Sequence, residues 1–297
     1  MEYSMGWMRD YPDIRDFAKT TDRVSSKLKV KGQTGSVKEM LTAVGIKNAT
    51  RKEIIPAKLD LRKWCSPVEN QGSLGSCTAH AGIAVVEYYE KRAFGKHLDG
   101  SRLFLYKTTR NLLNWQGDTG AYLRATMAAM AMFGIALEKY WPYDVNHYEK
   151  EPGAFLYALA QNYQAITYYR LDPIGTDSQM VLNSVKTHLQ AGLPAMFGFT
   201  CYSSLLTGIK GQIPYPNKTE KVIGGHAVVA VGYDDTMVIK NGNGKTTGAL
   251  MIRNSWGEEW GIGGYGYLPY DYILNGLAVD FWVLLKCEWI DSGNFGI

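Results

Sequence analysis

QGSLGSCTA, residues 71–79, places one cysteine, Cys77, directly after a flexible Gly/Ser segment. The run AGIAVVEYYE, residues 81–90, is small and apolar and predicts a buried helix that begins near this cysteine. The first turn of a helix has unpaired backbone N–H groups and the positive end of the dipole, so a thiol there is expected to have a lowered pKa. The pattern indicates a nucleophile. An isolated cysteine is more often a buried apolar group, so other segments must support this interpretation.

The composition is that of an ordinary globular protein. Apolar residues make up 46% of the 297-residue chain, enough for one large domain or two lobes. The net charge is only +4, and Lys and Arg are scattered apart from a patch at 27–31, so neither nucleic acid nor membrane is an expected partner. No apolar run spans a bilayer and the N-terminus does not look like a signal peptide, so a cytoplasmic location is expected, with export not excluded.

The four cysteines have no paired spacing such as C-x-x-C. Neither a disulfide framework nor a Cys-rich zinc site is therefore expected, and we predict no metal or other cofactor. Cys65, Cys201 and Cys287 lie in mixed apolar surroundings and are interpreted as structural thiols. His80 follows Cys77 by three residues, but no second Cys/His pair supports a metal site there.

The order of elements predicts an α+β protein of three parts. Residues 1–55 form an N-terminal extension or short pro-segment, with an aromatic stretch at 5–16 able to dock and a short helix over 36–44. Residues 56–164 form a mainly helical lobe that carries the nucleophile. Residues 165–297 form a mainly β lobe, with one helix over 178–190 and a hairpin turn at 241–244. Helices followed by strands indicate two lobes rather than a parallel α/β sheet.

Among five histidines, His226 is the best candidate for a base. It follows two glycines and opens the apolar strand 227–231, which fixes the ring at a sheet edge and leaves space beside it. His97 and His147 lie in polar stretches and His188 on an amphipathic helix, so these three are expected to be solvated.

The segment RNSWG, residues 253–257, supplies what such a base requires. The amide of Asn254 can orient a ring N–H without neutralising an imidazolium, and the indole of Trp256 can cover that hydrogen bond from water. A reactive thiol needs a base, a group that orients the base, and donors for an oxyanion. The three segments together supply these parts.

These segments resemble the papain-like cysteine peptidase family. Residues 71–77 match its leading signature, GHAV at 225–228 its His segment and NSWG at 254–257 its Asn segment. Cys77 and His226 are 149 positions apart (226 minus 77), inside the roughly 130–150 typical of papain and the cathepsins. The similarity extends from about residue 55 to about 285 and is that of a bacterial-type member without the usual disulfides.

The resemblance implies a papain-like two-lobed fold, with a helical lobe, an antiparallel β-barrel-like lobe and the active site in the cleft between them. It implies hydrolysis of a peptide or protein substrate through a thioester intermediate. Cys77 is then the nucleophile and His226 its partner in a thiolate–imidazolium pair. Asn254 orients His226, and the Gln71 side chain with the Cys77 backbone N–H forms the oxyanion hole. Part of residues 1–55 is expected to lie in or near the cleft and to regulate the enzyme.

The residues that the resemblance places against the substrate are Trp256, Thr119, Gly120, Leu123, Gly224 and Gly225. Trp256 belongs to the leaving-group side, and Thr119 and Gly120 to the substrate backbone. Leu123 and Gly224, closed by Tyr270 or Tyr272, imply a pocket for an apolar side chain two residues before the scissile bond.

The chain departs from the family at several positions. Leu74 and Asp118 stand where many members have a disulfide, Thr78 replaces an aromatic residue, and Ala121 replaces a glycine of the substrate loop. Two other functions remain open at this point. An acyl transferase would use the same thioester with an amine, and a non-catalytic member would only bind peptides.

Overall fold

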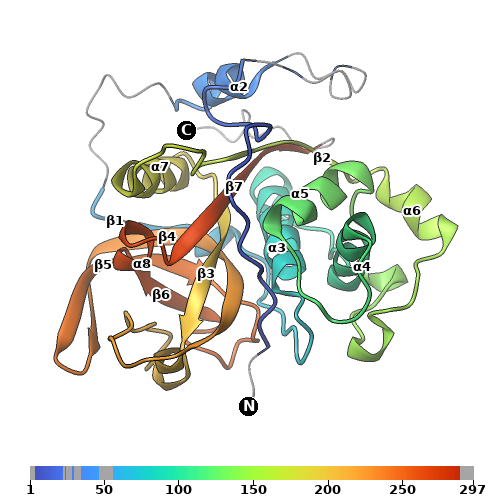
Figure 1. Ribbon diagram of the computed structural model, residues 1–297. Coiled ribbons are helices and arrows are strands. Elements are labelled where there is room, and N and C mark those ends of the chain that lie inside the picture. Colours follow the sequence, from blue (N-terminus) through green and yellow to red (C-terminus); the bar gives the residue numbers. More distant parts are fainter. Residues whose placement is uncertain (1–3, 23, 25–28, 30–34, 47–55, 288–297) are drawn as a thin grey trace.

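The computed structural model describes residues 4–22, 24, 29, 35–46 and 56–287 (Figure 1). Residues 47–55, which end at the boundary expected at 55/56, and residues 288–297 lie outside this part of the chain. Within it, every helix is too short or too polar to cross a membrane. The boundaries expected at 55/56 and 164/165 stay predictions, and the elements below show how the chain is distributed around them.

Helices dominate the chain from 77 to 160. They are α3 (Cys77–Phe94), α4 (Arg102–Leu113), α5 (Leu123–Met132) and α6 (Ala154–Ala160). The central one, α3, is buried continuously from Cys77 to Glu90, as its small apolar residues predict. It ends at Gly95, whose φ of 70° is the left-handed conformation that glycine adopts without strain. Outside this region lie α2 (Val37–Ala43), α7 (Ser178–Gln190) and α8 (Asp271–Leu274).

An antiparallel sheet forms most of the second half. Its strands are β1 (Lys58–Asp60), β2 (Ala165–Arg170), β3 (Ala195–Tyr202), β4 (Val222–Asn241), β5 (Gly244–Arg253), β6 (Tyr265–Pro269) and β7 (Ala278–Cys287). The strand order is β2-β7-β3-β4-β5-β6, with β1 paired to β4. Since β2 and β6 are the two ends of this path, the sheet is not closed into a barrel. It curves around the core against which α3 packs.

Several local predictions are confirmed. The helix expected over 36–44 is α2, where Ser36 and Glu39 form the reciprocal capping box that their spacing indicates. The hairpin turn is also present, because Asn241 pairs with Gly244 and Gly242 has φ 57°. All four cysteines are free and buried.

The prediction that His188 is solvated is wrong. Its imidazole is buried on the inner face of α7 and is 1% exposed. Nδ1 bonds to the backbone carbonyl of Ser184 at 2.6 Å, and Nε2 bonds to the Tyr169 hydroxyl. Both ring nitrogens are satisfied, so the side chain is a structural one.

Figure 1 shows α3 and α5 on one side, the sheet on the other, and the N-terminal segment as a dark blue trace between them. The two sides are also joined by a buried polar network. Glu87 of α3 accepts from the Arg102 guanidinium at 2.9 Å and from the Ser66 hydroxyl at 2.5 Å. Arg253 of β5 donates to the Ser66 backbone carbonyl at 2.6 Å and to the Ser66 hydroxyl at 3.0 Å. The segment around Ser66 is therefore held by both lobes.

Replacing Glu87 by Ala is expected to lower the free energy of unfolding by about 3–5 kcal/mol, because Arg102 and Ser66 lose their buried carboxylate partner. Glu87→Gln, which keeps the size and one acceptor oxygen, should lose less. Urea unfolding followed by circular dichroism measures both. Wild-type stability in Glu87→Ala would show that the network does not hold the lobes together.

Candidate active site

Cys77 lies beside the strand that carries His226, where the first turn of α3 faces β4. Cys77 is the first residue of the helix, and its sulfur accepts a hydrogen bond from the backbone N–H of Ala227 at 3.4 Å. Ala227 directly follows His226 in the strand, so the thiol lies against the segment that carries the imidazole. Both side chains are fully buried.

Asn254 fixes the imidazole. The residue follows the last residue of β5, and the antiparallel register of β5 with β4 brings it beside His226. Its Oδ1 lies 2.7 Å from His226 Nε2 and also accepts the backbone N–H of Ser255 at 2.8 Å. Because Oδ1 acts as acceptor, Nε2 carries the proton. Nδ1 is then the unprotonated nitrogen, and it has no hydrogen-bond partner among the described residues.

Trp256 covers this hydrogen bond. Its ring stacks on His226 with centroids 4.3 Å apart and an interplanar angle of 22°. The indole is 5% exposed. A His–Asn hydrogen bond beneath an aromatic ring is shielded from water and is stronger for it.

Gln71 is oriented by a residue that the sequence analysis missed. The hydroxyl of Ser255 donates to Gln71 Oε1 at 2.6 Å, which leaves Nε2 as the donor end of the amide. Nε2 donates to the carbonyls of Leu74 and Ser4 at 2.8 and 3.2 Å. The Tyr143 hydroxyl holds the Gln71 backbone carbonyl at 2.8 Å. Ser255 lies within the NSWG segment, so its position was a usable signal, whereas nothing in the sequence indicates Tyr143.

Asp118 also holds the loop of residues 71–75 in place. Its carboxylate accepts the backbone N–H of Gly75 at 2.9 Å and the hydroxyl of Tyr106. Asp118 and Leu74 are the two positions where many relatives of this sequence pattern have cysteines. A charge-assisted hydrogen bond to Gly75, the neighbour of Leu74, thus joins the two loops without a disulfide.

An N-terminal strap, residues 4–10, covers the thiol. On the helical side, Gly6 accepts the backbone N–H of Ala121 at 2.8 Å and Met8 donates to the Ala121 carbonyl at 3.1 Å. On the sheet side, Trp7 donates its backbone N–H to Gly225 at 3.0 Å. The carbonyl of Ser4 accepts from Gln71 Nε2 and from Trp256 Nε1, at 3.2 and 3.1 Å. The strap is hydrogen-bonded to both lobes.

Glycines allow this close passage. A Cβ at Gly6 would lie 1.8 Å from the Gly75 carbonyl oxygen, and one at Gly120 would lie 2.2 Å from the Gly6 carbonyl oxygen. Any side chain at these positions would separate the strap from the loops beneath it.

The prediction of a lowered pKa for Cys77 is wrong for this closed arrangement, although the backbone N–H groups of Thr78 and Cys77, in the first turn of α3, act in the predicted direction. Burial raises the pKa of the Cys77 thiol to about 11, although the backbone N–H groups of Ala227 and Gly6 oppose that rise. Burial also lowers the pKa of His226 to about 4, against the effect of its bond to Asn254. Both groups are therefore neutral near pH 7 in this arrangement, in which the strap lies over the thiol.

The residues expected to contact the substrate lie in the segments around the strap. Gly225 bonds to Trp7, and a Cβ at Gly224 would lie 2.7 Å from Met5 Sδ. The Thr119 hydroxyl donates to the Gly120 carbonyl at 3.0 Å. Leu123 begins α5 and is fully buried in the core. The substrate roles of these residues stay predictions.

The hydroxyls of the two tyrosines expected to close the specificity pocket bond elsewhere. Tyr270 donates to Asp235 at 2.7 Å and Tyr272 to the Pro214 carbonyl at 2.9 Å. Tyr272 is 1% exposed. Its ring belongs to the core of the sheet, where it packs edge-on against Phe199 with centroids 5.9 Å apart.

Alkylation of Cys77 by iodoacetamide in the full chain is expected to be slow at pH 7 and to accelerate steadily toward pH 11. A thiol whose pKa is about 11 is ionised in roughly one molecule in 10,000 at pH 7. Peptide mapping by mass spectrometry measures the rate for each cysteine, with the urea-unfolded chain as the control. Rapid, pH-independent labelling between pH 5 and 8 would show a preformed ion pair and contradict this expectation.

Comparison with known proteins agrees with this geometry. The family model described as papain family cysteine protease matches residues 55–275. An uncharacterized peptidase C1-like protein of Acanthamoeba polyphaga mimivirus is 31% identical over 98% of this chain and 90% of its own length. The crystal structure of xylellain, a cysteine protease from Xylella fastidiosa, has a TM-score of 0.71 at 30% identity, covering 95% of this chain and 96% of its own. Bromelain from Ananas comosus, in complex with the E64 inhibitor, has a TM-score of 0.57 at 20% identity over 78% of this chain and 100% of its own. The chain therefore belongs to the papain family of cysteine proteases.

Proposed function

We propose that this papain-family peptidase is held inactive by its N-terminal strap and becomes active when the strap is displaced. The observation that carries the proposal is the burial of Cys77, His226 and Asn254 beneath residues that hydrogen-bond to both lobes. The supporting argument is electrostatic, because the groups that must form a charged pair are kept out of water by the strap.

In the open enzyme, His226 Nδ1 holds the proton of the Cys77 thiol, and the Cys77 thiolate attacks the carbonyl carbon of a peptide bond. The carbonyl oxygen, now an oxyanion, accepts hydrogen bonds from Gln71 Nε2 and the Cys77 backbone N–H. His226 then gives its proton to the leaving amine, and a thioester remains on Cys77. Water, deprotonated by His226, hydrolyses the thioester and restores the thiol. Asn254 keeps Nε2 protonated throughout, so that Nδ1 always faces the reaction.

Strap displacement alters both pKa values in the direction that catalysis needs. Access of water lowers the pKa of Cys77 from its raised value and raises that of His226 from its lowered value. The N–H groups of the first turn of α3 remain and favour the thiolate. The same residues that are neutral in the closed chain thus form a thiolate–imidazolium pair in the open one.

The strap occupies the site in a non-productive direction. The Ser4 carbonyl lies on Gln71 Nε2, and the residues after it run parallel to the loop at Ala121, where Trp7 and Ala121 form a parallel bridge. The resemblance places Thr119 and Gly120 of this loop along the substrate backbone, and it places the pocket for the residue two before the scissile bond at Leu123 and Gly224. The loop is therefore taken to bind the residues that precede the scissile carbonyl. The strap places there the residues that follow its carbonyl. It therefore blocks the site without aligning one of its own peptide bonds for cleavage.

Gly6→Ala in the full chain is expected to displace the strap and to accelerate labelling of Cys77 by an epoxide inhibitor. The new Cβ meets the Gly75 carbonyl at 1.8 Å, and overpacking of this kind costs about 1–3 kcal/mol, a factor of about 5 to 150 in strap occupancy. Gly153→Ala is the matched control, since a Cβ there meets nothing within 4 Å.

Labelling and peptidase activity of Gly6→Ala should both be lost when His226→Ala is added. Mass spectrometry reports the labelling and a fluorogenic peptide reports hydrolysis. If a folded Gly6→Ala protein neither labels at Cys77 nor cleaves any peptide, a non-catalytic peptide binder is the better description. If an added amine nucleophile captures most of the acyl product, the protein is an acyl transferase.

Ser255→Ala in the Gly6→Ala background is expected to lower kcat by about tenfold with little change in KM, because the Gln71 amide loses the hydrogen bond that orients it. Gln71→Ala should cost more, on the order of 10²–10³ in kcat. Ser255→Thr, which keeps the hydroxyl, is the control and should retain most of the activity. An unaffected kcat in Ser255→Ala would show that Gln71 is held by its backbone contacts alone.

A further inference from the structure

The indole of Trp7 fills a site directly beside the catalytic pair. We call this space, between Gly198, Gly225 and Asp280, the Trp7 site. Gly225 precedes His226 on β4, and Gly198 on β3 pairs with Ala227, the residue that contacts the thiol. Trp7 itself is 6% exposed. The side chain held here is therefore one that a ligand in the cleft would present next to Cys77.

Two glycines give the Trp7 site its depth. A Cβ at Gly198 would lie 1.9 Å from Cε2 of the indole, and a Cβ at Gly225 would lie 2.8 Å from its Cε3. The nearest atoms to the Cβ position at Gly198 all belong to Trp7. The φ angle of Gly198 is not positive, so its backbone conformation does not require glycine. The missing side chain instead leaves space for a large ring.

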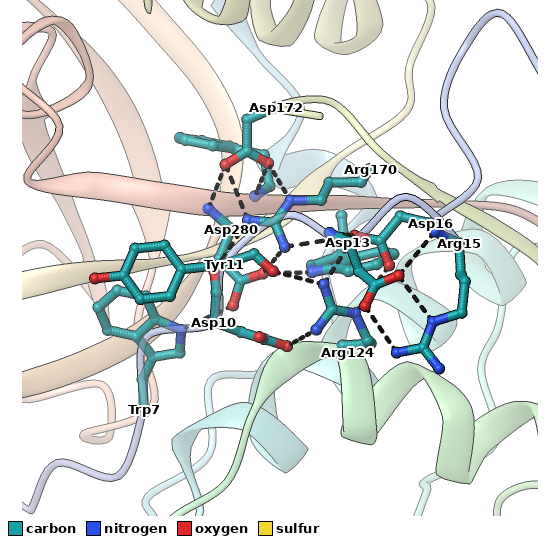
Figure 2. A network of polar contacts seen from close by, with 12 residues as sticks. Trp7, Asp10, Tyr11, Asp13, Arg15, Asp16, Arg124, Arg170, Asp172 and Asp280 are labelled. Carbon is teal, nitrogen blue, oxygen red and sulfur yellow. Dashed lines mark hydrogen bonds and ion pairs between the residues drawn. The ribbon is translucent and has the colours of Figure 1, made fainter. Parts of the chain in front are cut away.

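The far end of the site is polar rather than apolar. Trp7 Nε1 donates to Asp280 Oδ2 at 3.1 Å, and Asp280 is fully buried (Figure 2). The other oxygen, Oδ1, accepts from Trp282 Nε1 at 2.7 Å and lies 3.1 Å from the Arg170 guanidinium. Asp280 also has φ 67°, a left-handed conformation that is costly outside glycine. The backbone is thus held in an unfavourable conformation with one carboxylate oxygen directed at the ring that fills the site.

Displacement of the strap leaves this oxygen without its donor. A buried carboxylate oxygen that loses a hydrogen bond is destabilised unless a ligand or water replaces it. A substrate side chain that has the shape of an indole and carries an N–H at the same place fills the cavity and donates to Asp280 Oδ2. A phenylalanine side chain fills the cavity but has no N–H to donate to this oxygen.

The charges around the site favour a neutral donor over a cation. Arg124 pairs with Asp10, which belongs to the strap, and with Asp16, which lies beyond it in the N-terminal segment (Figure 2). When the strap leaves with Asp10, Arg124 and Arg170 remain beside Asp16, Asp172 and Asp280. Burial raises the pKa of Asp280 to about 7, so the site has no excess of negative charge to attract a cation. Since Asp280 is already paired with Arg170, a substrate lysine or arginine would bring an uncompensated positive charge to a dry site.

We propose that the Trp7 site is the specificity pocket of this enzyme and selects tryptophan, with Gly198 providing room for the ring and Asp280 accepting its N–H. The inference rests on the proposed peptidase function and names its substrate class. The strap then inhibits because it fills the pocket with the preferred side chain, while its backbone runs opposite to the direction of a substrate. This differs from the purely apolar pocket expected from the sequence.

Two full-length variants test the inference as a matched pair. Gly6→Ala displaces the strap and leaves the Trp7 site intact. Gly198→Val also displaces the strap, because its side chain occupies the position of the indole, and it narrows the site. Both are assayed for kcat/KM on fluorogenic peptides that differ only in the residue two before the scissile bond, which is Trp, Phe, Leu or Arg.

Gly6→Ala is expected to cleave the Trp peptide about tenfold faster than the Phe peptide, the value of one buried hydrogen bond to a carboxylate. Gly198→Val should reverse the order, with the Leu peptide cleaved at least about tenfold faster than the Trp peptide. Cleavage by both variants with the same preference for Leu or Arg overturns the inference and leaves the peptidase intact. Failure of both to cleave any peptide or to label Cys77 overturns the proposed function itself.

Discussion

The contact between the first turn of α3 and the middle of β4 is the constraint on which the site depends. It holds Cys77 Sγ on the backbone N–H of Ala227, and it exists because both elements are buried along nearly their whole contact. A sulfur placed by a helix and an imidazole placed by a strand keep their separation as long as the core is intact. The cost of this placement is desolvation, which raises the pKa of the thiol and lowers that of the imidazole. The two groups therefore need water, or a substrate's dipoles, before they can ionise.

The loop of residues 71–75 is held by hydrogen bonds where many members of the family have a disulfide. Asp118 accepts the N–H of Gly75 beside Leu74, so the loops that many relatives join by a disulfide are joined here by a carboxylate. Tyr106 donates to the same carboxylate, and Tyr143 holds the Gln71 carbonyl. Such bonds hold without an oxidising environment, whereas a disulfide does not. The loop keeps its shape through hydrogen bonds that start from three different segments.

The strap combines weak recognition by the backbone with strong recognition by one side chain. Its backbone pairs with Ala121 on one lobe and Gly225 on the other, as an added strand would. Its passage depends on Gly6, whose missing side chain lets the chain approach Gly75. Trp7 supplies the anchor, with its ring over Gly198 and its N–H on the buried Asp280. Backbone pairing of this kind is open to any extended peptide, so the selectivity proposed above rests on the side-chain site.

The sequence by itself determined the elements and the chemical parts of the site. The small residues after Cys77, the two glycines before His226 and the NSWG segment are local patterns, and local patterns specify helices, strand edges and turns. Ser255 stands within the NSWG segment, but its contact with Gln71, 184 positions away, is not a local pattern. Tertiary structure alone decided what surrounds those parts. The burial of Cys77 reversed the expected direction of its pKa shift, His188 turned inward to Tyr169, and Trp7 met Asp280 from 273 positions away. Desolvation and long-range contacts depend on which segments pack together, and no window of sequence contains both partners.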